Sequence, residues 1–184
     1  MTIRRFLPLA AVTLVLTLTG ADDATQKISA RGITFEVPKD WKTGKPSSSM
    51  RLAQLKVGPE KGDDDAAELV LFAFAGGGGS VEANLARWKV QFEGKDGKAP
   101  EITTDKRKGK NVDVTFAETS GRYVAAMTPG SPAKNDKPNW QLLGAIVQSG
   151  DTGYYFKMVG PEKTMKAAKP AFEAMIKTIA VAKD

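Results

Sequence analysis

The sequence predicts an α+β fold in which a mostly antiparallel sheet carries helices on both faces. Short segments of alternating apolar and polar residues follow one another through brief polar turns, as antiparallel strands do. Residues 68–74 are almost continuously apolar, which suits a central strand covered on both faces. Two amphipathic helical patterns, one in mid-chain and one near the C-terminus, then provide a cover for each face.

The strands of the first half are placed by their apolar spacing and by the turn residues between them. They occupy residues 33–37, 50–57 and 68–74, and Pro38 ends the first. Residues 42–49 are rich in Gly, Pro and Ser and predict a loop.

The second half predicts a weak strand and three clearer ones, at 102–105, 112–116, 140–148 and 154–159. The strand from 112 continues past Gly121 towards Ala126 as a bulged or separate strand. Residues 128–138 contain three prolines and predict an exposed loop.

The first helix is expected at about 80–93, with Ser80 as its N-cap and Gly94 as its end. Its apolar stripe recurs at helical spacing and consists of Val81, Leu85, Trp88 and Phe92. The closing helix has a second such stripe, made of Met165, Ala168, Phe172, Met175, Ile176 and Ile179.

The N-terminus has the layout of a secretory signal peptide. Arg4 and Arg5 supply positive charge before the uncharged residues 6–18, and small residues lead up to Ala21. We therefore expect cleavage between Ala21 and Asp22, an exported (periplasmic or extracellular) protein, and no stable membrane span afterwards. An uncleaved anchor is the alternative, although the apolar stretch is shorter than the roughly 20 residues of a transmembrane helix.

Composition narrows the chemistry that is available. The 184 residues include no His and no Cys, which excludes disulfides, thiol nucleophiles, His-based triads and His- or Cys-ligated metals. The net charge of +6 falls to +4 without residues 1–21, which hold two Arg and no acid. Because the remaining Lys residues are mixed with acids, we expect no nucleic-acid partner, and we expect no metal or cofactor. Residues 22–184 predict a single domain with its core at about 31–180.

Two short runs suggest ligand sites, and each has a simpler interpretation. Gly76–Gly79, between a strand and a helix, has the position of an anion-binding loop, but it lacks the Lys of a phosphate-binding loop. A flexible turn into the helix is the simpler interpretation. Asp63–Asp65 offers oxygen ligands to Ca²⁺ without the alternating spacing of a calcium loop, so a solvated turn is favoured.

The candidate binding residues lie on one helix edge and one strand face. Asn84, Arg87 and Gln91 form a polar edge beside the apolar stripe of the first helix. As structure rather than binding site, Asn84 would hydrogen-bond the preceding loop and Arg87 would pair with an acid. Tyr155 and Lys157 share a strand face, where an exposed tyrosine beside a lysine offers a recognition surface. We expect Tyr154 and Phe156 to pack in the core.

Two groups of residues carry a resemblance to known proteins. Phe35-Glu36-Val37-Pro38 followed by Trp41 resembles the opening of PsbP-like domains. The segment 78–84, followed by Arg87-Trp88 and Gln91-Phe92, is similar to small exported bacterial proteins of unknown function. The resemblance implies an α/β/α sandwich and export, and PsbP-like domains are typically non-catalytic binding or assembly factors.

The sequence therefore predicts an exported, non-enzymatic binding or assembly domain whose partner is a protein or a cell-envelope component. One alternative is a hydrolase that works without His or Cys and uses carboxylates drawn from Glu36, Glu68, Glu82 and Glu118. Another is an anion- or metal-binding module at 76–79 or 63–65.

The signal peptide can be tested by mass spectrometry of the exported protein. We expect the mature N-terminus at Asp22, because the small residues before it fit the signal peptidase. A chain that still begins at Met1 or Thr2 would contradict the cleaved signal and favour the anchor.

Overall fold

A computed structural model describes residues 24–128 and 130–182; the predicted signal peptide lies outside this range. The first half contains β1 (Thr25–Ala30), β2 (Ile33–Pro38), β3 (Lys42–Gly44), β4 (Arg51–Val57), β5 (Ala67–Ala75) and a 3-10 turn, η2 (Gly76–Gly78). Helix α1 (Val81–Lys89) is followed by β6 (Phe92–Glu93), β7 (Thr103–Lys108) and β8 (Asp113–Tyr123). The chain continues through β9 (Lys137–Ser149), β10 (Thr152–Pro161), α2 (Glu162–Thr178) and β11 (Ala180–Val181).

The strands form two antiparallel sheets. The large sheet has the order β3-β4-β5-β10-β9-β8-β6, and β7 also pairs with β8. The small sheet has the order β1-β2-β11. Strand β5 lies inside the large sheet between β4 and β10, as its continuous apolar run predicts. The predicted mostly antiparallel α+β fold is therefore confirmed.

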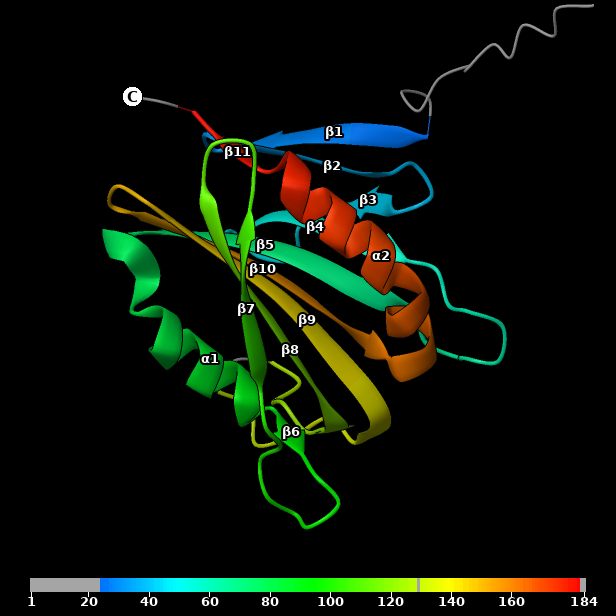
Figure 1. Ribbon diagram of the computed structural model, residues 1–184. Helices are drawn as coiled ribbons and strands as arrows, with labels where there is room; N and C mark the ends of the chain where they lie inside the picture. The colour runs from blue at the N-terminus through cyan, green and yellow to red at the C-terminus, as the bar shows by residue number, and fades with distance from the viewer. Residues whose placement is uncertain (1–23, 129, 183–184) are drawn as a thin grey trace, which may run out of the picture.

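The larger core lies between the large sheet and the layer formed by α2 and β2 (Figure 1). Phe35 of β2 meets Phe156 of β10 edge to face, with ring centroids 5.0 Å apart. Phe172 of α2 packs near Phe116 of β8. Tyr154 and Phe156 are both buried in this core, which confirms the role predicted for them.

A second core lies on the opposite face of the same sheet, beneath α1 (Figure 1). Trp88 of α1 and Phe92 of β6 are buried there among Leu142, Ile146 and Tyr155 of the sheet. Helices thus cover both faces, which makes the fold an α/β/α sandwich. Because successive side chains of β9 and β10 point to opposite faces of the sheet, both strands contribute residues to both cores.

Short elements account for most differences from the sequence prediction. The first helix ends at Lys89, because Phe92 already belongs to β6 and pairs with Tyr123. The predicted loop 42–49 begins with the edge strand β3, which the backbone of β4 holds. Strands β1 and β11 extend beyond the expected core limits of 31 and 180. The predicted bulge is present in β8, where its register with β9 shifts at Gly121.

The approach of α1 to the sheet depends on a glycine. A Cβ atom at Gly144 of β9 would lie 2.2 Å from Cζ3 of Trp88, well inside van der Waals contact. The indole therefore packs directly against the strand backbone, and any larger residue at 144 would displace it.

A double-mutant cycle tests this packing. Trp88→Ala should lower the free energy of unfolding by about 3–5 kcal/mol, because it empties a buried site. Gly144→Ala should cost about 1–3 kcal/mol in the wild-type background and clearly less in Trp88→Ala, where the clash is absent. Denaturant unfolding measures all four proteins.

Gly58→Ala is the matched control, since no atom lies within 4 Å of the added methyl. Equal effects of Gly144→Ala in both backgrounds would contradict the contact with Trp88.

Candidate functional site

The polar edge of α1 lies directly over strand β10, so the predicted binding residues meet in pairs. Asn84 donates from Nδ2 to the Tyr155 hydroxyl at 3.2 Å. Gln91, which was predicted to lie in the helix, follows α1 in a turn, and its side-chain oxygen accepts a hydrogen bond from the Lys157 ammonium. The helix edge and the strand face identified from sequence are thus two sides of one contact.

The first pair is structural. Asn84 is buried and donates from Nδ2 to the carbonyl oxygens of Gly78 and Ser80, at 3.2 and 2.9 Å. This confirms the structural interpretation of Asn84. Arg87 is exposed and donates to Asn84 Oδ1 at 3.1 Å, so the expectation that it would pair with an acid is wrong. Arg87 supports the amide that holds the loop.

Tyr155 is 2% exposed, so its predicted place on an open recognition surface is wrong. Its hydroxyl donates to the carbonyl oxygen of Gly77 and accepts from Gln148 Nε2 at 3.1 Å. The physical reason is that the glycine turn and α1 cross over this face of β10 and cover the ring.

The glycine turn therefore points carbonyl oxygens at the Tyr155 side chain of β10 beneath it. Gly77 and Gly79 face the Tyr155 hydroxyl, and the Gly77 N–H donates to Asp151 at 2.8 Å. An anion-binding loop needs free N–H groups at its centre, so this arrangement favours the simpler interpretation, a turn that leads into α1. Ser80 caps that helix by accepting from the Ala83 N–H, as predicted.

The second pair lines an open hollow of about 620 Å³ at the C-terminal end of α1. Its floor comes from strands that are distant in sequence: Arg51 of β4, Glu68 of β5 and Lys157 of β10. Gln91 lies beside Lys157. A volume of this size suits a small ligand or a few side chains of a partner.

The aromatic wall of the hollow is made by Tyr123 and Trp140, whose rings stack 5.4 Å apart at 10°. The Lys157 ammonium lies over the Tyr123 ring, 5.7 Å from its centroid. Burial raises the pKa of Tyr123, and Glu68 adds to that rise while Arg51 opposes it. Tyr123 is therefore a neutral ring at physiological pH.

Two exposed apolar side chains extend the hollow outwards. Val90 and Met127 line it with 67% and 63% of their surfaces exposed, and Met50 is the other large apolar residue so exposed in the described range. Large apolar side chains gathered at one surface position are a feature of interaction sites.

The charges on the floor do not balance. Arg51 forms an ion pair with Glu68 at 3.0 Å, and Gln54 donates to the same carboxylate at 2.6 Å. Lys157 has no ion pair with a carboxylate in the part of the chain that the structure describes. The pKa of Lys157 is lowered to about 8, chiefly by burial and also by Arg51, while Glu68 partly opposes both effects.

Arg51 and Tyr123 were not identified from the sequence, and Glu68 was named only as one of four carboxylates for a hydrolase. The strand order that brings β4, β5 and β8 to one hollow cannot be read from local patterns. Only the alternation of Tyr155 and Lys157 and the polar edge of α1 indicated this region.

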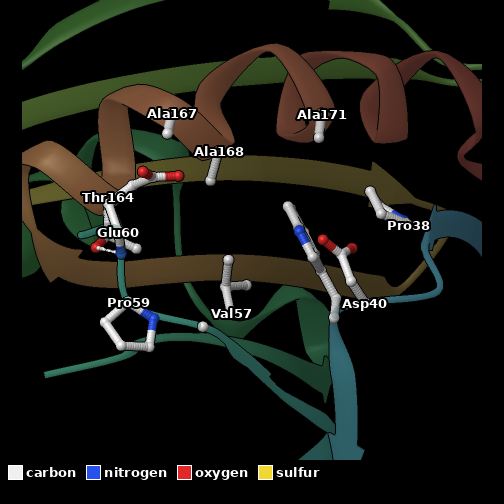
Figure 2. A pocket seen from close by; sticks show the side chains of 11 residues that line it. Pro38, Asp40, Val57, Pro59, Glu60, Thr164, Ala167, Ala168 and Ala171 are labelled. Atoms are coloured by element: carbon white, nitrogen blue, oxygen red, sulfur yellow. Dashed lines mark hydrogen bonds between the residues drawn. The ribbon is translucent and has the colours of Figure 1, made fainter.

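A second hollow, of about 390 Å³, lies between α2 and the segments after β2 and β4 (Figure 2). Alanines of α2 line one side, and Asp40 and Glu60 line the other. Both carboxylates are exposed. A pair of carboxylates that divides the roles of acid and base usually has one member in a buried, apolar environment, and neither of these two has one.

Two residues of the acidic run 63–65, Asp63 and Asp65, make structural contacts. Asp63 accepts from the N–H and hydroxyl of Thr164 and so caps the start of α2. Asp65 pairs with Lys137 at 2.8 Å. Within residues 24–128 and 130–182, no three carboxylates gather in a way that would hold a metal ion.

The carboxylates proposed for hydrolysis are dispersed. Glu36, Glu68 and Glu118 form ion pairs with Lys110, Arg51 and Lys169 respectively. Glu82 lies in the first turn of α1 on the other side of the sheet from α2.

Comparison with known structures supports the fold. The chain resembles the solution structure of cyanobacterial PsbP (CyanoP) from Synechocystis sp. PCC 6803, with a TM-score of 0.54 and 14% sequence identity. The match covers 95% of this chain and 99% of that one. The fold is PsbP-like.

The PsbP-like fold confirms the sandwich that the opening motif implied. No protein-family model and no curated protein sequence matches the chain. No helix among the described residues is both long and apolar enough to cross a membrane.

The lysine in the hollow gives a testable pH dependence. The unfolded chain has an ordinary Lys157 pKa of 10.5, so between pH 8 and 10.5 it binds more protons than the folded protein. Wild-type stability should therefore gain about 1–2 kcal/mol from this group between pH 7 and 9.5. Lys157→Met should lose that gain.

Denaturant titrations of both proteins across this pH range measure the difference, and the other lysines cancel because both proteins contain them. Lys56→Met, at an exposed position on β4, is the control and should follow the wild type. Parallel profiles for wild type and Lys157→Met would contradict the lowered pKa.

Proposed function

We propose that this protein is an exported, non-enzymatic domain that binds a protein partner at the hollow beneath the C-terminal end of α1. The observation that carries the proposal is the composition of that hollow. It combines Lys157 and Gln91 with an aromatic wall and with the exposed Val90 and Met127.

Several features favour binding over catalysis. The chain has no His and no Cys, and the second hollow places only exposed carboxylates beside an alanine-lined helix. The first hollow holds one carboxylate, which is already paired with Arg51, beside the amines of Lys157 and Lys134. Shape and apolar exposure, rather than a set of proton-transfer groups, distinguish the surface.

Export is supported by the sequence of the first 21 residues and fits a partner in the cell envelope. The PsbP-like fold agrees with a binding role only at the level of architecture, because one fold hosts many functions.

Site-specific photo-crosslinking in the producing cells tests the proposal. A benzophenone amino acid at Met127 should give an adduct with a distinct protein, because that side chain borders the hollow. The same amino acid at Lys166, exposed on α2 on the other face, is the control and should not give it. Adducts are identified by mass spectrometry.

An identical adduct pattern at both positions would contradict binding at this surface. An adduct with a second copy of this chain would show that the hollow mediates self-association instead of binding a partner.

A further inference from the structure

The inference concerns the chemistry of the group that enters the hollow, and it rests on the function proposed above. An ammonium group has three N–H donors. At Lys157 the Gln91 oxygen accepts one, and the face of the Tyr123 ring lies nearby. An acceptor that arrives from the open side of the hollow therefore finds donor capacity still available.

The sign of the charge on that acceptor follows from the neighbouring groups. The charged and titratable side chains that line the hollow are Arg51 on β4, Glu68 on β5, Tyr123 on β8, Lys157 on β10 and Lys134 in the loop before β9. Arg51 and Glu68 are paired with each other, so the remaining charge is positive. That positive charge comes from Lys157 and Lys134, so an anionic group on the partner complements the hollow.

The size of the occupant follows from the apolar rim. A small anion on Lys157 would leave Val90 and Met127 exposed to water. A partner that also covers these side chains gains apolar burial in addition to the ion pair. The aromatic wall of Tyr123 and Trp140 offers a flat surface for the same purpose.

We propose that the hollow receives an acidic side chain of a partner protein, whose carboxylate pairs with the Lys157 ammonium. An apolar or aromatic residue next to that acid packs against Met127, Val90 and the aromatic wall. The recognised element is thus a short acidic–apolar segment exposed on the partner.

The affinity of the hollow for a carboxylate should depend on pH. A bound carboxylate favours the charged lysine, so it raises the pKa of Lys157 from about 8. Binding is then strongest below pH 8 and weakens as the pH rises through it, because the free protein must take up a proton to bind. Tyr123 does not titrate between pH 7 and 9, since its pKa lies above its usual value.

Two model peptides test the proposal on the purified protein: acetyl-Ala-Phe-Asp-Ala-amide and the same peptide with Asn in place of Asp. Binding is followed by NMR through the methyl groups of Val90 and Met127. We expect the Asp peptide to bind about tenfold more tightly at pH 7, as for a charge-assisted hydrogen bond. Its affinity should fall by about tenfold at pH 9, while that of the Asn peptide stays constant.

Lys157→Met should remove the preference for Asp, and Lys56→Met should keep it. If Lys157→Met does not fold, the pH dependence of the wild type decides the question. Equal, pH-independent binding of both peptides would overturn the acidic specificity while leaving the binding surface intact. Sodium acetate that binds as tightly as the Asp peptide would show that the occupant is a small anion and would also overturn the proposal.

Failure of both peptides to shift the methyl signals overturns the inference. The proposed function is then judged separately by the crosslink at Met127, which does not depend on the charge of the partner.

Discussion

The docking of α1 onto the sheet is the constraint on which the candidate site depends. Trp88 reaches the backbone of β9 because position 144 is glycine, and Asn84 reaches the Tyr155 hydroxyl beneath the glycine turn. These two contacts fix the axial position and the rotation of the helix. Gln91 lies in the turn directly after the helix, where its amide contacts Lys157.

The same docking explains why one strand face has two different roles. At Tyr155 the glycine turn covers β10 completely, and every polar group there has a partner within the chain. Two residues further along, the helix has ended and the face opens. Lys157 therefore lies at the boundary between a satisfied buried network and solvent, where an amine is partly desolvated but still accessible.

Sequence patterns predicted the layers well because burial on two faces leaves a strong periodic signal. The stripe of Trp88 and Phe92 and the continuous run of β5 placed a helix on one face and a strand in the interior. The site was predicted only in part. Gln91 and Lys157 could be found from local spacing, but Arg51 and Glu68 reach the hollow through the strand order, which local spacing does not encode. Tyr155 was misplaced because alternation assigns a face without saying what covers it.

A lysine that is partly desolvated beside an arginine lowers the stability of the protein at neutral pH. At a position with a purely structural role, an apolar side chain would avoid this loss of stability. Two other lysines with structural contacts, Lys169 and Lys137, pair with the carboxylates of Glu118 and Asp65. Lys157 has no such carboxylate partner among the described residues and is the lysine whose pKa is lowered by burial. A carboxylate that pairs with Lys157 would remove this electrostatic destabilisation. Because the destabilisation is present only in the free protein, its removal would add to the affinity for a partner.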